Sequence, residues 1–445
     1  MCRTLAMDNT AAKLIRITKK AQEEQKYRFT FLKYLLNEAY LQACYKELKT
    51  GKAAGIDGRT VESYSTEEMM QAIQDTIMNM KNNRYRPQPI RRVRIRKENG
   101  GERLLGIPSV IDKVVQLGCT KILESIFEPT FLPVSYGYRP GRNAHECLKE
   151  INHMGMQKRV NYIIEADIEG FFDHVNHDWM MRCLQERIGD PRFLRLIKQF
   201  LKAGVMDGDH RIETTEGTPQ GGILSPVLAN IYLHYVLDLW FRVKVQKQVK
   251  GYSQLIRYAD DFVIGCQYKE EAEQVLRELQ GRLEQFGLRL SEEKTRIMEF
   301  GRFAAVNRKK RGEKKPESFD FLGFTHYCGR TRDGRFALKV KTSRIRMKRG
   351  LHTMQEWLKT IRNILPVREF WPLFKMKLAG HYQYYGVSGN FEEIQRFYQQ
   401  TRRLAFKWLN RRSQKKSWNW EQFQKMELRF PLPQPKLYYA FYNTW

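Results

Sequence analysis

The sequence lacks the paired cysteines and the long apolar runs that mark several classes of protein. Its seven cysteines are scattered and none stands in a Cys-x-x-Cys pair, so neither a zinc module nor a disulfide framework is predicted. No apolar run approaches the roughly 18 residues of a membrane span, and the amino terminus has no apolar signal core. No internal repeat or low-complexity linker is apparent. The default expectation is a cytoplasmic protein without a membrane partner.

Acidic residues are also few compared with basic ones. The chain has 78 Lys and Arg against 49 Asp and Glu, a formal charge of +29 over 445 residues. Such an excess repels itself in a compact protein unless a polyanion covers part of it, so nucleic acid is the expected partner. The alternative is a basic surface that only confers solubility. With 42% hydrophobic and 29% charged residues, the chain has a globular composition and room for about two to four structural units.

Short-range patterns predict both strands and helices. Val93 and Ile95 alternate with arginines before Asn99-Gly100, which is a strong hairpin signal. The run NYIIEADI over 161–168 predicts a buried strand, and alternation around Asp260 predicts another. These segments indicate a sheet in the middle of the chain.

The remaining patterns are helical. Residues up to about Tyr85 read as helices, and apolar residues between 270 and 286 line one helical face that Gly287 would end. The last hundred residues are helical and basic, and Asn390 with Glu393 resembles a capping box. We therefore expect an α+β protein with a helical carboxy-terminal part.

Three carboxylates stand out against this background. Asp260 and Asp261 are adjacent in RYADDFVIG, where they would repel one another and lose hydration unless a cation neutralised them. Since side chains alternate along a strand, a tight turn at Ala259-Asp260 is needed to aim both at one point. Asp167 follows a second apolar strand. Three acidic oxygens on neighbouring strands would suit Mg²⁺, whereas an isolated Asp-Asp pair is usually an ordinary solvated pair.

Six motifs, in chain order, resemble those of one family. YADD at 258–261, TPQGGILSPVLANI at 218–231 and FLGF at 321–324 are similar to conserved blocks of reverse transcriptases. GIDG at 55–58, SYGYRPGRNAH at 135–145 and GHYQYYGVSGN at 380–390 are similar to group II intron reverse transcriptase/maturases in particular. The resemblance extends from about Lys52 to the carboxy terminus, and it covers most of the chain.

The resemblance implies an α+β right-hand polymerase: fingers, a palm with an antiparallel sheet, and a helical thumb that is also the maturase region. The expected organisation is an amino-terminal extension and start of fingers over 1–85, fingers over 86–160, a palm over 161–335 with part of the fingers inserted at about 180–215, a thumb over 336–412, and a short basic segment over 413–445. That last segment would be a reduced DNA-binding region at most. The paired cysteines and histidines of the endonuclease found in many relatives are not expected here.

The resemblance also implies roles for particular residues. Asp167, Asp260 and Asp261 would be catalytic and would hold two Mg²⁺ ions together with the carbonyl of Ile168. Phe172 falls where reverse transcriptases place a bulky steric gate against the ribose 2′-hydroxyl. The full set expected to bind the nucleotide is Lys97, Arg103, Phe172, Gln220, Gly221 and Lys294.

Ordinary structural interpretations compete with several of these roles. Phe172 could be a core residue beside Phe171, Gln220-Gly221 part of a plain turn, and Lys294 a surface lysine rather than the general acid for the pyrophosphate leaving group. Aromatic and basic residues of the thumb could pack its helices or contact RNA. The residues expected to bind nucleic acid are Arg139, Arg142, Asn143, Phe321, Gly323, Lys375, His381, Tyr384 and Arg403.

The expected function is RNA-directed DNA synthesis by a group II intron protein that also binds its intron RNA to assist splicing and retrohoming. Its partners would be the intron RNA, an RNA template with a DNA primer, deoxynucleotides and target DNA. A domesticated reverse transcriptase in phage defence or DNA repair is the alternative. An RNA-dependent RNA polymerase is disfavoured by YADD and by Phe172, and a pure RNA-binding protein by the undamaged motifs. The oligomeric state cannot be predicted.

Overall fold

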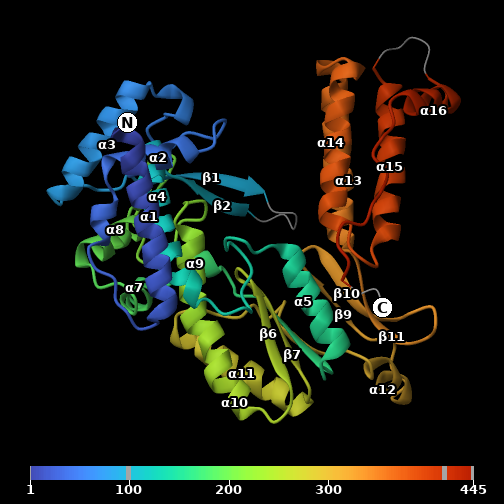
Figure 1. Ribbon diagram of the computed structural model, residues 1–445. Coiled ribbons are helices and arrows are strands. Elements are labelled where there is room, and N and C mark those ends of the chain that lie inside the picture. Colours follow the sequence, from blue (N-terminus) through green and yellow to red (C-terminus); the bar gives the residue numbers. More distant parts are fainter. Residues whose placement is uncertain (1, 97–101, 413–417, 442–445) are drawn as a thin grey trace. The chain divides into compact units, whose positions relative to one another are not determined.

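The computed structural model describes residues 2–96, 102–412 and 418–441 (Figure 1). The chain forms two compact units. The first comprises Met1–Asn143, Ile164–Ile264 and Glu270–Arg296, and the second Ala144–Ile163, Gly265–Lys269 and Ile297–Trp445. Among the helices in the described ranges, none combines the length and apolar character that crossing a membrane requires.

The first unit begins with helices, as the sequence predicts. Its amino-terminal elements are α1 (Cys2–Glu23), the 3-10 turn η1 (Leu32–Leu35), α2 (Glu38–Glu47), the 3-10 turn η2 (Val61–Ser63), α3 (Thr66–Lys81), α4 (Val110–Phe127) and the 3-10 turn η3 (Glu128–Thr130). Ser65 and Glu68 form a complete capping box at the start of α3. Helix α4 is buried along most of its length and packs against α1 and α2, so it forms the centre of this helical part.

A small sheet follows in the first unit. Strands β1 (Ile90–Arg96) and β2 (Glu102–Ile107) pair antiparallel, with Arg91 opposite Ile107 and Arg96 opposite Glu102. This confirms the predicted hairpin, whose turn lies outside the described residues. Strands β4 (Val205–Asp207) and β5 (His210–Ile212) complete the strand order β2-β1-β4-β5.

The second sheet has the strand order β6-β7-β3-β8. Its strands are β3 (Tyr162–Ala166), β6 (Ser253–Tyr258), β7 (Asp261–Cys266) and β8 (Arg296–Glu299). The N–H of Asn161, just before β3, donates to the carbonyl of Cys266 at the end of β7 over 3.0 Å. Strands β3 and β7 therefore run antiparallel, and the end of β3 lies at the same edge of the sheet as the start of β7.

Several helices and helical turns lie between strands β3 and β8 in the sequence. They are α6 (Phe171–His174), α7 (His177–Gln185), α8 (Pro191–Leu201), α9 (Ser225–Leu233), the π-helical turns η4 (His234–Asp238) and η5 (Phe241–Val245), α10 (Gln246–Gln248) and α11 (Lys269–Gln285). Helix α11 buries Ala272, Val275, Leu279 and Leu283, and Gly287 follows it at φ +77°. The predicted helix and its glycine stop are both confirmed.

The second unit contains a three-stranded sheet and a helical bundle. The sheet has the order β11-β10-β9, with β9 (Ser318–Phe321), β10 (Phe324–Arg330) and β11 (Phe336–Thr342), and α5 (Ala144–Gln157) contacts β11. Helix α12 (Ala304–Lys310) precedes it. The bundle consists of α13 (Arg344–Ile364), α14 (Val367–Tyr385), α15 (Phe391–Leu409) and α16 (Trp420–Arg429). Phe423 of α16 is fully buried in the core of this bundle, so α16 is an integral part of it.

The predicted capping box at Asn390 is wrong. The side chain of Asn390 makes no capping hydrogen bond to α15. It accepts from the N–H of Thr342 over 2.7 Å and donates to the Thr342 hydroxyl and to the Tyr385 carbonyl. Thr342 lies 48 residues away in sequence, whereas Tyr385 is close by. The side chain of Asn390 thus ties the end of β11 to the end of α14 instead of capping α15.

Candidate polymerase active site

The two adjacent aspartates lie at the turn of the β6–β7 hairpin. Strand β6 ends at Tyr258, Ala259 and Asp260 form the turn, and Asp261 begins β7. Ala259 has φ +58°, a left-handed conformation that a residue with a Cβ rarely adopts. The predicted tight turn is therefore present, and it places both carboxylates at one end of the hairpin.

A buried ion pair between Arg257 and Asp238 stabilises this strained turn. The guanidinium of Arg257 is fully buried and binds the carboxylate of Asp238 in η4, with Nε to Oδ1 at 2.8 Å and Nη2 to Oδ2 at 2.5 Å. Its remaining nitrogen donates to Asn230 over 3.0 Å and to the carbonyl of Ala259 over 2.8 Å. A fully desolvated charge is tolerated only with such complete pairing. Arg257 thereby fixes the carbonyl of the left-handed residue.

Gly137 packs directly against the same turn. A Cβ at Gly137 would lie 2.4 Å from the N of Ala259, so a side chain cannot be accommodated there. The carbonyl of Gly137 accepts from Asn230 over 2.8 Å, and the neighbouring Tyr136 donates to the carbonyl of Arg257. The motif SYGY, identified in the sequence, thus packs directly on the aspartate hairpin.

The third aspartate reaches the same edge of the sheet. Asp167 follows the last residue of β3, and its carbonyl accepts from the N–H of Ser291 over 2.8 Å. Ile168 pairs with Leu290, and Glu169 donates to Arg289. Because β3 and β7 are antiparallel neighbours, Asp167 lies at the edge where Asp261 begins its strand.

Lys294 forms an ion pair with the third aspartate, Asp167. The turn after Ser291 brings its Nζ to 2.7 Å from Oδ2 of Asp167. The hydrogen bond to Asp167 raises the pKa of Lys294, and the charges of Asp167, Asp261 and Asp260 raise it further against the effect of partial burial. An ammonium group therefore already occupies a position that all three carboxylates favour for positive charge.

The donor set fits a hard cation such as Mg²⁺, since it consists of carboxylate oxygens and an adjacent backbone carbonyl. The Lys294 ammonium lies 2.7 Å from Asp167, and the charges of Asp261 and Asp260 also favour its protonated form. Within the described ranges, no three His, Cys, Asp or Glu side chains converge as closely as metal ligands would. Metal binding by Asp167, Ile168, Asp260 and Asp261 stays a prediction.

A glycine-containing loop lies against strand β2. The carbonyl of Gln220 accepts from the N–H of Gly106, and Gly221 has φ +107°. A Cβ at Gly221 would lie 2.5 Å from the Gly106 carbonyl oxygen. Ser225 and Gln116 hold the loop further, through the carbonyl of Pro219 and the N–H of Ile223. The loop needs glycine at 221 both for its backbone conformation and for this close approach.

The same loop is bonded to the helical turn that carries the expected steric gate. The N–H of Thr218 donates to the carbonyl of Phe172 over 2.7 Å. The ring of Phe172 is 8% exposed and meets the ring of Phe171 edge-on at 5.3 Å. The structure thus brings together Phe172, the Gln220 loop and strand β2. Lys97 and the side chain of Arg103 lie outside the described residues.

The predicted nucleic-acid contacts of the first unit differ in exposure. Arg139 is 8% exposed, binds Glu128 through two nitrogens and donates to the carbonyls of Leu132 and Ser135. These contacts favour a structural role for Arg139. Arg142 is half-buried with its guanidinium 5.3 Å from the Tyr136 ring, and Asn143 is exposed. Contact with nucleic acid by these three residues stays a prediction.

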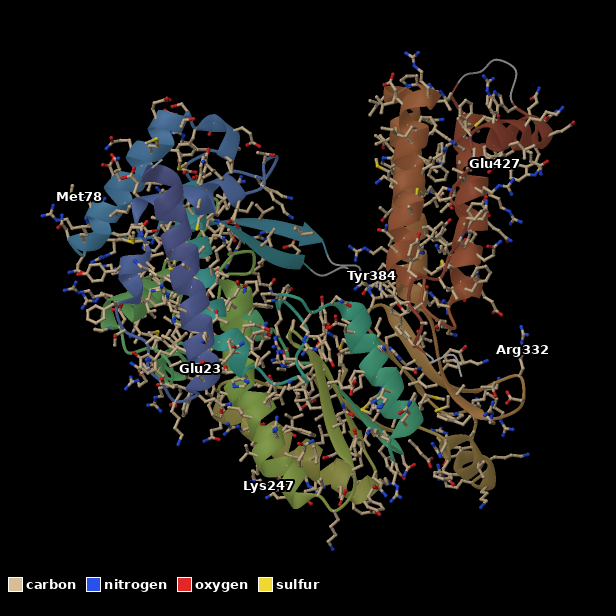
Figure 2. All side chains as sticks on the ribbon, in the orientation of Figure 1. Glu23, Met78, Lys247, Arg332, Tyr384 and Glu427 are labelled. Atoms are coloured by element: carbon tan, nitrogen blue, oxygen red, sulfur yellow. The ribbon has the colours of Figure 1, made fainter. Side chains whose placement is uncertain are left out.

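In the second unit, several predicted RNA contacts also take part in packing. The Tyr384 hydroxyl donates to the carbonyl of Leu322 at the lower end of α14 (Figure 2). His381 stacks on Phe397 with the ring centroids 3.5 Å apart, and desolvation lowers the pKa of His381 to about 4. Phe321 is buried and Gly323 has φ +83°. Arg403 is exposed and Lys375 half-buried.

An antiparallel sheet with aspartates at one edge and helices packed beside it, in a strongly basic chain, defines the palm of a right-hand nucleic-acid polymerase. The profile of the family described as reverse transcriptase (RNA-dependent DNA polymerase) matches residues 95–326. The chain therefore belongs to the reverse transcriptase family, and its motifs resemble those of the group II intron branch in particular.

Several curated relatives support this placement. The chain is 41% identical over 242 residues to the group II intron-encoded protein LtrA of Lactococcus lactis, covering 52% of this chain and 39% of that protein. It is 34% identical over 282 residues to protein YkfC of Escherichia coli K12, covering 56% of this chain and 73% of that protein. An uncharacterised 91 kDa protein in the cob intron of Schizosaccharomyces pombe is 36% identical over 221 residues, covering 49% of this chain and 27% of that protein. The match thus spans well under two thirds of the intron-encoded relatives.

Sequence reasoning missed the supporting residues Arg257, Asp238 and Asn230. One signal was available, because Arg257 follows Leu255 and Ile256 in strand β6 and shares a side of that strand with Leu255. A charge at such a position must be paired if the strand is buried. Its partner could not be identified from sequence, since Asp238 lies in a π-helical turn with no distinguishing pattern.

Proposed function

We propose that this protein is an RNA-directed DNA polymerase that extends a DNA primer on an RNA template and assists splicing by binding group II intron RNA. The observation that carries the proposal is the edge of the sheet at which Asp260 and Asp261 lie on a strained, fully supported hairpin beside Asp167. Family membership supplies the reaction class, and the formal charge of +29 supplies the affinity for nucleic acid.

Within this proposal, two Mg²⁺ ions bound by the aspartates would polarise the attacking and leaving oxygens of the phosphoryl transfer. The chain's own residues arrange the reaction. Asp167, Asp260 and Asp261 supply the negative charge, with the Ile168 carbonyl beside them. Lys294, whose ammonium donates a hydrogen bond to Asp167, would give a proton to the pyrophosphate leaving group.

The nucleotide would be bound by the elements that hydrogen bonds join around Phe172. Gly221 allows the backbone to approach the nucleotide, Gln220 contacts its sugar or base, and Lys97 and Arg103 of the β1–β2 hairpin bind its triphosphate. The Phe172 ring excludes a ribose 2′-hydroxyl by its bulk. Target DNA and intron RNA are further proposed partners, with Arg142, Asn143, Lys375 and Arg403 as candidate contacts.

The test is extension of a DNA primer annealed to RNA in the presence of Mg²⁺. We expect extension with deoxynucleotides, a loss of at least roughly a thousandfold in Asp260→Asn, and retained RNA binding in that variant. Asp209→Asn, an exposed carboxylate in the β4–β5 turn, is the matched control and should extend normally. Equal activity of Asp260→Asn and the control would refute the assignment, and loss of RNA binding together with synthesis would contradict the division of roles.

The gate has a separate test. In Phe172→Ala, the ratio of ribonucleotide to deoxynucleotide incorporation should rise by roughly tenfold or more, because the pocket gains room for the 2′-hydroxyl. The ratio is measured within one variant, so a general loss of folded protein cancels. An unchanged ratio would leave Phe172 as a core residue packed on Phe171.

A further inference from the structure

We propose that the surface formed by η1, the end of α3 and the start of α8 is a binding site for a single strand of RNA, separate from the aspartate edge. The ligand would place a phosphate against Lys33, Arg192 and Arg195 and stack bases on Phe31 and Tyr34. The choice of RNA rests on the proposed function, which supplies an RNA template and an intron RNA.

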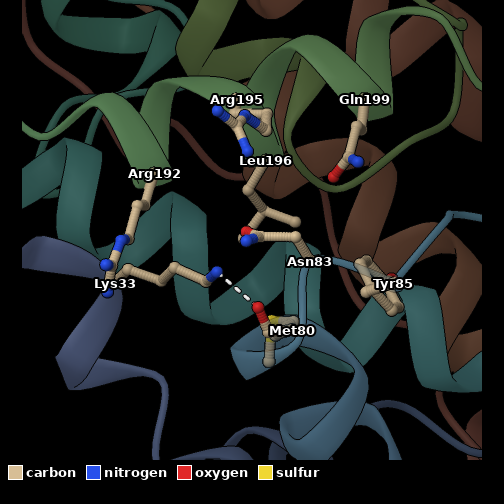
Figure 3. Close-up of a pocket in the computed structure, with 8 residues that line it drawn as sticks. All are labelled: Lys33, Met80, Asn83, Tyr85, Arg192, Arg195, Leu196 and Gln199. Carbon is tan, nitrogen blue, oxygen red and sulfur yellow. Dashed lines mark hydrogen bonds between the residues drawn. The ribbon is translucent and has the colours of Figure 1, made fainter.

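The first observation is a pocket lined by three cations (Figure 3). Lys33 lies at its edge, with Nζ donating to the carbonyl of Met80 over 2.6 Å, and Arg192 and Arg195 project from α8. The nearby arginines and partial burial lower the pKa of Lys33, with burial the larger cause. Asn83 and Gln199 add amide groups to the lining. An anion in this pocket would relieve the repulsion among the cations.

The protein neutralises these cations only in part, through the carboxylate of Asp190, whose charge raises the pKa of Lys33 against burial and the two arginines. In the part of the chain that the structure describes, neither Arg192 nor Arg195 has a carboxylate within ion-pair distance, and both are exposed. The acid nearest to this group, Asp190, is buried and already engaged. It accepts from the backbone N–H groups of Arg192, Phe193 and Lys33 at 2.9–3.1 Å. One carboxylate faces three cations, so a phosphate would supply the counter-charge that remains.

The second observation concerns two exposed aromatic rings on the same short element. Phe31 is 73% exposed and Tyr34 is 71% exposed, with their ring centroids 6.3 Å apart. Phe31 also has φ +59°, a left-handed conformation that strains a bulky residue. Exposure of the ring gives no burial energy to offset that strain. Strained residues of this kind are concentrated at functional sites, and exposed rings between cations are the usual platform for unpaired bases.

The two features belong to one rigid surface. The N–H of Phe29 donates to the carbonyl of Arg187 over 2.8 Å, and Gly189 returns a bond to Phe29 over 2.7 Å. The carboxylate of Asp190 caps α8 and also accepts from the N–H of Lys33 in η1, so it joins the two elements. These bonds join the segment that carries Phe31, Lys33 and Tyr34 to the start of α8, which carries Arg192 and Arg195.

A photocrosslinking experiment tests the site on the full chain. An RNA of about 12 nucleotides carrying 4-thiouridine, within the usual length of a single-strand site, is crosslinked in the presence of excess primer–template duplex. We expect crosslinked peptides that contain Phe31 or Tyr34. In Phe31→Asn, which removes the ring at a position where asparagine tolerates the backbone, crosslinking should fall roughly fivefold or more.

Salt dependence tests the phosphate contacts. In Arg192→Gln/Arg195→Gln, the slope of log K against log salt for the same RNA should decrease by about 1.4, which corresponds to two lost contacts to a single strand. Arg242→Gln/Lys247→Gln removes the same charge from an exposed part of η5 and α10 (Figure 2) and should keep both the slope and the crosslinks.

Three results would overturn the proposal: crosslinks unaffected by Phe31→Asn, a change in slope equal to that of the control pair, or preferential competition by single-stranded DNA over RNA. Extension of a short primer–template should be unchanged in all these variants. If the wild type failed to extend a primer, the proposed polymerase activity would be refuted but the RNA site would not, because crosslinking is measured without synthesis.

Discussion

At the residue scale, Arg257 is the group on which the aspartate hairpin depends most. It is fully buried, it neutralises Asp238, and it donates to the carbonyl of Ala259 in the turn between the strands. A buried ion pair is weak evidence for stability in itself, because removing both charges from water costs free energy. Because Arg257 also donates to the carbonyl of Ala259, the pair helps to fix the position of the neighbouring aspartates.

We expect Arg257→Met to lower the free energy of unfolding by about 3–5 kcal/mol, because it leaves the Asp238 carboxylate buried without a counter-charge. Arg257→Met combined with Asp238→Val removes both charges and should recover most of that loss. Chemical denaturation measures both values. A single variant as stable as the wild type would contradict the pairing.

The double variant also separates positioning from stability. Its rate of primer extension should remain at least roughly tenfold below that of the wild type, and the Mg²⁺ concentration for half-maximal rate should rise, since the Ala259 carbonyl has lost its donor. A stable double variant with normal rate and normal Mg²⁺ dependence would show that Arg257 serves the fold alone.

At the scale of elements, the Gln220 loop has little room for a side chain at Gly221. Gly221→Ala would bring a Cβ to 2.5 Å from the Gly106 oxygen at a backbone conformation that only glycine adopts readily. We expect the loop to move away from β2 and the KM for deoxynucleotides to rise by roughly tenfold or more. Steady-state extension kinetics measure this.

The control for that prediction is Gly208→Ala. Gly208 also has a positive φ, +63°, but a Cβ there would meet nothing within 4 Å. This variant should show only the small backbone strain of about 1–2 kcal/mol and an unchanged KM. If both variants changed KM alike, the close approach of the loop to β2 would not be the cause.

The elements themselves were largely predictable from sequence. Alternation around Asn-Gly gave the β1–β2 hairpin, the apolar face over 270–286 gave α11, and the Ala259-Asp260 turn followed from the need to aim two adjacent side chains together. These signals are local, because periodicity and turn chemistry act within a few residues. That Asp167 lies at the same edge of the sheet as the hairpin could be expected only if the two strands were neighbours, which the sequence does not show.

The sequence could not predict which partners a polar side chain would find in the folded chain. Asn390 has the sequence pattern of a helix cap, but its amide finds Thr342 and Tyr385, which only the folded bundle brings to it. Arg139 stands in a basic, glycine-containing motif that suggests an exposed contact, but Glu128 and two carbonyls bind it inside. In both cases a tertiary partner competes successfully with the local pattern.

At the scale of the whole molecule, buried histidines predict how stability depends on pH. Desolvation lowers the pKa of His234 to about 4 and that of His326 to about 3. The unfolded chain then binds more protons than the folded chain below about pH 6.5, so stability falls as the pH decreases from there toward those values. Tm measured from pH 7.5 to pH 5 should decrease steadily.

His326→Phe isolates one contribution. His326 is fully buried and stacks on Phe319 with the centroids 4.8 Å apart, so an aromatic replacement preserves that contact without a titrating group. The dependence of Tm on pH should become shallower in this variant, whatever its absolute stability. A slope equal to that of the wild type would mean that carboxylates dominate the acid response.

The net charge of +29 predicts a steep response of RNA binding to salt. If six or more phosphates are contacted, affinity for a primer–template should fall by roughly a thousandfold between about 50 and 200 mM KCl. Fluorescence anisotropy at several salt concentrations checks this. Affinity that is nearly independent of salt would contradict a charge-driven interface.

We infer that Asp167, Asp260 and Asp261 together form a cation site at one edge of the sheet. Titration of the protein with Mn²⁺, followed by electron paramagnetic resonance, measures this without reference to synthesis. We predict that the wild type and Asp209→Asn bind a class of Mn²⁺ ions that Asp260→Asn has lost. Equal Mn²⁺ binding by all three proteins would contradict the claim.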